Sequence, residues 1–182
     1  MIATIIIIAV VAILVLWVIS VQNKLVKMDE FCKNALKQIN VQQMSRFDAI
    51  KALVKLTREY ADFEGETLQK VIAERKITSN PSPSAADINR NEAALSAMQH
   101  SLNVVVEKYP ELKASQNYLQ TMNDIKGYEE NVRLSRMTFN DTVTRYNNQV
   151  RMFPGSVVAA MLSFPQREYL ADEPSKADFP EI

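Results

Sequence analysis

The chain contains few of the residues on which many catalytic and binding sites depend. Its 182 residues include one cysteine, one histidine and three glycines, and 21 basic residues balance 21 acidic ones. A single cysteine excludes an internal disulfide and suits a reducing compartment. Balanced charge argues against a nucleic-acid surface, which is usually basic. No glycine-rich phosphate loop occurs in the sequence, and we expect neither a cofactor nor a nucleic-acid partner.

The lone histidine and the lone cysteine both favour structural roles. A di-iron helical bundle needs Glu-x-x-His pairs on two helices, but Ala97 stands three residues before His100. We therefore expect His100 to face solvent. Cys32 falls in an apolar stripe between Met28 and Ala35, which predicts a buried small hydrophobic residue rather than a nucleophile. We expect no catalytic residue, no metal site and no enzyme activity.

The longest hydrophobic run is a stretch of eighteen uncharged residues from Ile2 to Ile19. As a helix rising about 1.5 Å per residue it would span roughly 27 Å, close to the hydrocarbon thickness of a bilayer. No A-x-A cleavage pattern follows the run and no Lys or Arg precedes it, which favours an uncleaved anchor over a signal peptide. The predicted anchor covers residues 1–21. Its lipid-facing side chains include Ile2, Ile8, Leu14, Trp17 and Ile19.

Two lysines that follow the run predict the orientation of the anchor. Positive charge close to a membrane-spanning helix tends to stay on the cytoplasmic side. Lys24 and Lys27 lie downstream of the run, and no basic side chain lies upstream of it. We therefore expect a single-pass protein with its N-terminus outside and its body in the cytoplasm.

The residues after the anchor predict long helices, starting with one that continues from the membrane span. Between Val21 and Ile77 there is no proline and only one glycine. One apolar stripe contains Leu25, Met28, Cys32, Ala35 and Ile39, and a second contains Phe47, Ile50, Val54, Thr57 and Ala61. Both have the three-four spacing of a helix face. Gln42, Gln43, Ser45 and Arg46 fall between the stripes. We therefore expect a bend or break near residues 42–48, and the end of the helix near residue 76.

Two further helices follow a proline-rich loop at residues 78–83. Ser84 and Asp87 match a capping box at the start of the first. Its expected heptad-like seam contains Ile88, Asn91, Leu95, Met98, Leu102, Val105 and Tyr109. Pro110 ends this helix and suits the first turn of the next, which we expect over residues 111–152. Its apolar positions include Leu119, Val132, Phe139, Tyr146 and Phe153. Gly127 within it predicts a kink or close packing, and the Pro154-Gly155 pair ends it.

These elements predict an all-α protein. An N-terminal transmembrane helix is followed by an antiparallel three- to four-helix bundle of long helices over residues 22–164. The tail, residues 165–182, contains three prolines and scattered charges. We expect it to be flexible or draped over the surface.

An ordered set of short motifs lies between residues 22 and 165. It includes Asn23-x-Leu25-Val26, Gln38-Ile39-x-Val41-Gln42, Tyr109-Pro110-x-Leu112-Lys113-Ala114, Asn117-Tyr118-Leu119, Glu130-Asn131-Val132-x-x-Ser135-Arg136, Phe139-Asn140, Tyr146-Asn147 and Phe153-Pro154. In this order the motifs resemble the LemA family, with the apolar run in its expected place. The chain departs at Ala49-Ile50-Lys51, where family members often carry a proline. The missing proline favours a helix that continues through residues 42–48.

The resemblance implies a membrane-anchored four-helix bundle without known catalytic activity, linked to membrane organisation or to membrane-protein quality control. We expect the protein in the inner membrane of a bacterial cell. The favoured hypothesis is a scaffold that assembles into a homo-oligomer at the cytoplasmic face of the lipid bilayer. The alternative is an adaptor or regulator of another membrane protein, such as a membrane protease.

Two groups of residues are candidates for the functional surface. Polar side chains in or beside apolar stripes are Glu64, Asn91, Glu130, Asn140 and Asn147. They either fix helix register or form an interhelical polar network at an interface or groove. The apolar segment near the end of the bundle contains Phe153, Val157, Met161 and Phe164. It either covers the bundle end or contacts the bilayer or a second copy.

Overall fold

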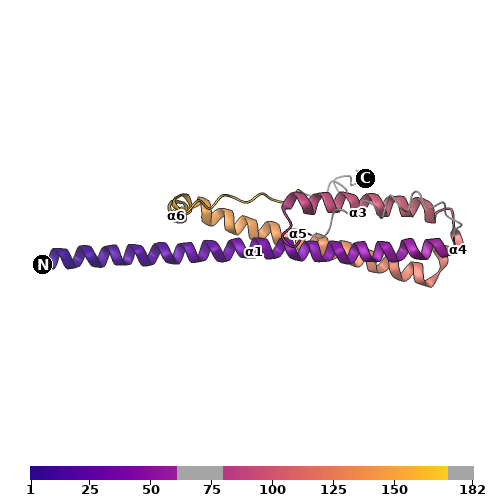
Figure 1. Ribbon diagram of the computed structural model, residues 1–182, viewed down its shortest axis with the longest axis horizontal. Coiled ribbons are helices and arrows are strands. Elements are labelled where there is room, and N and C mark those ends of the chain that lie inside the picture. The colour runs from indigo at the N-terminus through magenta and orange to yellow at the C-terminus, as the bar shows by residue number, and fades with distance from the viewer. Residues whose placement is uncertain (61–79, 172–182) are drawn as a thin grey trace, which may run out of the picture. The chain divides into compact units, whose positions relative to one another are not determined.

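The structure is a computed structural model that describes residues 1–60 and 80–171, without the side chains of residues 58–60. The chain is all-α, and no strand occurs within the described ranges. The helices are α1 (Ile2–Tyr60), α3 (Ala85–Val106), α4 (Pro110–Ala114), α5 (Gln116–Arg151) and α6 (Gly155–Met161) (Figure 1). The predicted helix end near residue 76 and the candidate residue Glu64 lie outside the described residues.

Helix α1 is uninterrupted from the apolar run to Tyr60 (Figure 1). The expected break at residues 42–48 is therefore wrong, and the alternative of a continuous helix is confirmed. Ile39, Gln43, Arg46 and Ile50 are all buried and follow one another at steps of three or four residues. A single helix face thus runs through the polar residues. Gln42, Gln43, Ser45 and Arg46 were interpreted as a gap between two stripes, but Gln43 and Arg46 are members of one stripe.

Helix α3 begins with the predicted capping box. The Ser84 hydroxyl accepts a hydrogen bond from the Asp87 backbone N–H, and the Asp87 carboxylate accepts one from the Ser84 backbone N–H. Such a pair satisfies two of the backbone donors that a helix start leaves free. The predicted seam is buried from Ile88 to Leu102. After Leu102 the buried face continues at Val106 rather than at the predicted Val105, because this step is four residues. Tyr109, the last predicted member, lies beyond the end of α3 and is partly buried.

The predicted third helix is divided in two. Pro110 occupies the first turn of α4, as expected, but Ser115 has an extended backbone (φ −68°, ψ 141°) before α5 starts. Its hydroxyl accepts a hydrogen bond from the Tyr118 N–H. The restart shifts the helix face, so Tyr118 is 7% exposed and Leu119, expected in the apolar face, is 53% exposed. Helix α5 continues through Gly127, and no atom lies within 4 Å of the place a Cβ would take. The expectation of close packing there is wrong.

The chain divides into two compact units. Unit 2 comprises residues 36–137 with residues 170–182, of which 170 and 171 are described. Its hydrophobic core joins the C-terminal part of α1 to α3, α4 and the first half of α5. The core contains Phe47, Ile50, Leu53, Val54, Leu95, Met98, Leu102, Val106, Leu112, Tyr118 and Ile125.

Unit 1 comprises residues 1–35 and 138–169. Its buried residues come from α1, the end of α5 and α6, and are Leu25, Cys32, Ala35, Phe139, Val143, Tyr146, Asn147, Gly155, Val158 and Ala159. By length and composition, the start of α1 could cross a membrane: its most apolar window has a mean hydropathy of 3.3 and no buried residue. Phe153, expected in the same stripe as Phe139 and Tyr146, lies beyond the end of α5 and is exposed.

Candidate functional site

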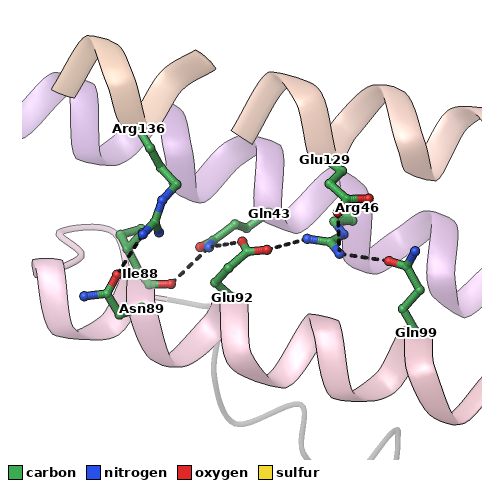
Figure 2. Close-up of polar contacts among 8 residues, drawn as sticks. All are labelled: Gln43, Arg46, Ile88, Asn89, Glu92, Gln99, Glu129 and Arg136. Atoms are coloured by element: carbon green, nitrogen blue, oxygen red, sulfur yellow. Dashed lines mark hydrogen bonds and ion pairs between the residues drawn. The ribbon is translucent and has the colours of Figure 1, made fainter. Parts of the chain in front are cut away.

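A polar network joins three helices of unit 2 (Figure 2). The Arg46 side chain, from α1, is 2% exposed. Its Nη1 forms an ion pair with Glu92 Oε1 of α3 at 2.5 Å, and its Nη2 donates a hydrogen bond to Gln99 Oε1 at 2.8 Å. Glu129 Oε1, from α5, lies 4.0 Å from Arg46 Nη2. One arginine therefore links α1 to both α3 and α5.

Gln43 extends this network by one turn along α1. Its side chain is fully buried. Its Nε2 donates hydrogen bonds to the Ile88 carbonyl oxygen and to Glu92 Oε2, each at 3.0 Å (Figure 2). The Glu92 carboxylate thus accepts from Gln43 with one oxygen and from Arg46 with the other. Two donors from α1 fix the position of this carboxylate on α3.

Helical periodicity explains why these residues meet. Gln43 and Arg46 are three residues apart on α1, while Glu92 and Gln99 are seven apart on α3. Both spacings keep side chains on one helix face. The contacts also give the helix directions in unit 2. Residue numbers rise together along α1 and α3, so these helices run in the same direction. Arg136 of α5 contacts Asn89 near the start of α3, whereas Glu129, earlier in α5, lies near Arg46, which binds Glu92 farther along α3. Helix α5 therefore runs in the opposite direction.

The network favours one alignment of the helices. A buried ion pair repays the desolvation of its charges only when its geometry is good and its other polar atoms are satisfied. Among the described residues, Gln43 Oε1 and Arg46 Nε have no hydrogen-bond partner. The net gain in stability is therefore modest, but a slip of α3 along α1 would leave the Arg46 and Glu92 charges buried without each other. The contacts specify register more than they add stability.

Arg136 of α5 forms a second polar link in unit 2. Its side chain is buried, and its Nη2 donates to Asn89 Oδ1 of α3 at 3.3 Å (Figure 2). The same Nη2 also donates to the Ala171 carbonyl oxygen. Leu170 beside Ala171 is buried as well. Arg136 therefore binds the chain just after the point where the tail was expected to begin.

A polar cluster in unit 1 fastens residues 165–169 to helices. The Asn147 side chain on α5 accepts a hydrogen bond from the Arg167 backbone N–H and donates one to the Arg167 carbonyl oxygen, both at 2.9 Å. The Tyr146 hydroxyl donates to the Pro165 carbonyl oxygen at 2.8 Å. The Arg167 guanidinium forms an ion pair with Asp29 of α1. Residues 165–169 are therefore bound to the helices of unit 1. The rest of the predicted tail beyond residue 171 lies outside the described residues.

Burial and neighbouring charges shift the pKa of Asp29 in opposite directions. Burial raises the pKa of its carboxyl, but hydrogen bonds from Lys33 and Arg167, with the charges of both, outweigh burial and hold that pKa below its ordinary value. Burial raises the pKa of the neighbouring Cys32 thiol. Cys32 is fully buried, as predicted, and the predicted exposure of His100 is also observed.

The structure separates the predicted polar residues. Asn91 is buried in α3, and among the described residues its Oδ1 has no hydrogen-bond partner. Asn147 is buried and binds the Arg167 backbone. Asn140 is half-buried, and its carbonyl oxygen accepts a hydrogen bond from Thr144. Glu130 is exposed and forms an ion pair with Arg133 of the same helix. Asn91 and Glu130 belong to unit 2, and Asn140 and Asn147 belong to unit 1.

The anchor and end-segment residues lie largely on the surface. Ile2, Ile8, Leu14 and Ile19 are exposed, Trp17 is partly exposed, and Lys24 and Lys27 are exposed. In the end segment, Phe153, Val157 and Met161 are exposed and Phe164 is partly buried. Val158 and Ala159 between them are buried. Helix α6 thus covers part of unit 1 and also presents an apolar face.

Sequence reasoning missed the central residues of the network, Gln43, Arg46 and Glu92. A signal for the first two was present, since Gln43 and Arg46 continue the spacing Ile39, Gln43, Arg46, Ile50 on one face of α1. A long polar side chain at a buried position of a stripe predicts a polar partner on the facing helix. Nothing in the spacing alone names Glu92 as that partner.

Comparison with known proteins agrees with the resemblance to the LemA family. Protein LemA of Metamycoplasma hominis is 26% identical over 141 residues, which cover 78% of this chain and 64% of the relative. The chain thus matches less than two thirds of that relative's length. The sequence profile of the LemA family matches residues 35–182, which is well over half of the chain. This chain belongs to the LemA family.

Proposed function

We propose that this chain is a non-catalytic scaffold, anchored in the membrane by residues 2–19, whose helical body assembles with other copies at the cytoplasmic face. The observation that carries the proposal is the exposure of the apolar side chains in the first part of α1. All residues from 1 to 16 are exposed, although all but Ala3, Thr4, Ala9 and Ala12 are large and apolar. A soluble surface rarely leaves so large a contiguous apolar area exposed, whereas a bilayer accommodates it.

The orientation follows from the charges that flank this segment. Lys24 and Lys27 are exposed just beyond it, on the side that the positive-inside rule assigns to the cytoplasm. Protease treatment of intact cells tests this part of the proposal. The body should survive in intact cells and be digested once they are lysed. Digestion from outside would show the opposite orientation.

Exposed apolar side chains outside the anchor support assembly. Val41 lies on α1, and Leu119, Leu134 and Met137 lie on α5, and each is exposed. Anchoring confines the copies to a plane and raises their effective concentration, so weak lateral contacts can suffice. Arg46, the most buried charged side chain among the described residues of unit 2, binds Glu92. This pair supports the internal structure of the scaffold rather than a reaction.

The assembly is tested with the full chain in mild detergent and in reconstituted membranes. Light scattering after size-exclusion chromatography should give a multiple of the 20.6 kDa chain mass, after correction for detergent. Cysteine cross-linking locates the contact. Val41→Cys and Met137→Cys should yield linked copies, while the exposed polar positions Asp48→Cys and Asp141→Cys serve as matched controls. The native Cys32 is buried and should not react. A chain that stays monomeric at high concentration, with equal cross-linking at all four positions, would contradict the scaffold.

A further inference from the structure

Helix α6 presents apolar side chains on the surface of unit 1. Phe153, just before the helix, is 83% exposed, and Val157 and Met161 are 48% and 71% exposed. Gly155, Val158 and Ala159, which alternate with them, are buried. One face of the short helix therefore packs against the rest of unit 1, while the opposite, apolar face is exposed.

Local geometry fixes the exposed face in place. A Cβ at Gly155 would lie 2.4 Å from the Gln149 carbonyl oxygen, so only glycine allows α6 to turn this closely against the end of α5. At its other end, Ser163 has a positive φ of 56°, and the Phe164 N–H donates to the Ala159 carbonyl oxygen at 2.9 Å. This is the Schellman arrangement that ends many helices. The exposed side chains do not belong to a frayed end.

Chain geometry places α6 near the end of the apolar run of α1. Arg167 binds Asp29 of α1, and the nonhelical chain from Leu162 to Arg167 can span at most about 16 Å. That upper limit equals about eleven residues of helix, so the end of α6 lies no farther along α1 than about residue 18, counted from Asp29 toward the N-terminus. Figure 1 shows the end of α5 and α6 directed toward the N-terminal part of α1. Residues 1–16 are all exposed, and Trp17 and Val18 are the first that are partly covered.

The charges around α6 complement an anionic surface. Residues 17–28 and 151–167 contain Lys24, Lys27, Arg151 and Arg167 and no Asp or Glu. Arg167 is bound to Asp29, while Lys24, Lys27 and Arg151 are exposed. Basic side chains beside an apolar helix face are typical of elements that lie in the headgroup region of a membrane.

We propose that α6 is a second membrane contact: Phe153, Val157 and Met161 enter the boundary between headgroups and acyl chains, and Lys24, Lys27 and Arg151 bind lipid phosphates. The inference rests on the proposed anchoring by residues 2–19. It assigns α6 to the bilayer rather than to a second copy of the chain. Contact at two places would restrain unit 1 at the membrane surface, which a single helix alone leaves free to tilt.

Fluorescence quenching in vesicles tests this contact with the full chain. A polarity-sensitive dye is attached to Phe153→Cys, Val157→Cys or Met161→Cys in a Cys32→Ala background, and the protein is reconstituted with phosphatidylethanolamine and phosphatidylglycerol. Leu14→Cys reports on the anchor, and Asp141→Cys, exposed on α5 in the same unit, is the aqueous reference. Lipids carry a nitroxide either near the headgroup or deep in the chain.

The three α6 positions should be blue-shifted relative to position 141 and should lose most of their emission to the shallow nitroxide. Position 14 should respond most strongly to the deep one. Replacing phosphatidylglycerol with phosphatidylcholine should weaken quenching at α6 and leave position 14 unchanged. If α6 is quenched only by an aqueous quencher while position 14 responds to lipid, the α6 contact is wrong and the anchor stands. Protection of α6 from both quenchers would assign it to a protein contact and overturn the proposal. Failure of position 14 to respond would overturn the anchor and the inference together.

Discussion

The Arg46–Glu92 pair of unit 2 joins one helix to another, whereas Asn147 of unit 1 fastens a nonhelical segment to a helix. Arg46 and Glu92 bind each other as charges among apolar residues of three helices. Asn147 instead binds a backbone N–H and C=O, as a neighbouring strand would. Removing either partner of the Arg46–Glu92 pair is strongly destabilising, because the other partner is left as an unpaired buried charge. Removing the Asn147 side chain releases only the nonhelical segment that it binds.

The largest expected effect comes from breaking the pair in unit 2. Arg46→Met should lower the free energy of unfolding by about 3–5 kcal/mol, because Glu92 is left without its charged partner in a largely buried place. Urea unfolding of the full chain in mild detergent, followed by circular dichroism, measures the change. Lys51→Met, at an exposed position of the same helix, is the matched control. The double variant Arg46→Met/Glu92→Met should recover much of the loss. Equal losses for Arg46→Met and Lys51→Met would show that the pair is not important.

A smaller and local effect is expected in unit 1. Asn147→Ala removes two hydrogen bonds and should cost about 1–3 kcal/mol, seen as faster hydrogen exchange in residues 165–169. Peptides of unit 2 should exchange as before, because Asn147 contacts only unit 1 in the hydrogen bonds described above. Asn148→Ala, at the exposed neighbouring position, should change little. If unit 2 also opened in the Asn147 variant, the contrast between the two units would be lost.

An effect of opposite sign is expected on the solvent side of α5. Gly127→Ala should raise the free energy of unfolding by about 1 kcal/mol, because alanine favours the helix and restricts the unfolded chain. The added methyl group meets no atom within 4 Å. Urea unfolding in detergent measures the gain. A loss of oligomer mass in this variant would instead show that another copy packs closely against Gly127.

The smallest effect concerns pH in unit 1. The folded pKa of Asp29 lies below its unfolded value, so its stabilising contribution is complete above the unfolded pKa, about 3.9. The contribution is lost as pH falls through the folded pKa. Asp29→Asn should therefore be less stable than the native chain near neutral pH, by less than about 1 kcal/mol because the pair is partly exposed. The difference should shrink in acid. Thermal unfolding across acidic pH measures it, and a constant difference would contradict the assignment.

The sequence predictions were accurate for features that depend on neighbouring residues in one helix. They were less accurate for features that depend on contacts between two helices. The Ser84 capping box, the apolar run and the burial of Cys32 follow from neighbours along the chain, and the structure confirms the capping box and the burial. The break near residues 42–48 was a wrong prediction because polar residues were assumed to interrupt a buried face. Whether Gln43 and Arg46 can be buried depends on Glu92, nearly fifty residues away. Ser115 shows a similar limit, since one extended residue shifts which face of α5 is buried.

By itself, the sequence determined an all-α chain whose first helix is apolar enough to span a bilayer, and its ordered motifs indicated the LemA family. These properties depend on local composition and spacing. Only the tertiary structure decided which polar residues are buried and how residues 165–171 bind the helices. A buried polar group is tolerated only when a partner from a distant part of the chain satisfies it, and sequence spacing along one helix carries no information about that partner.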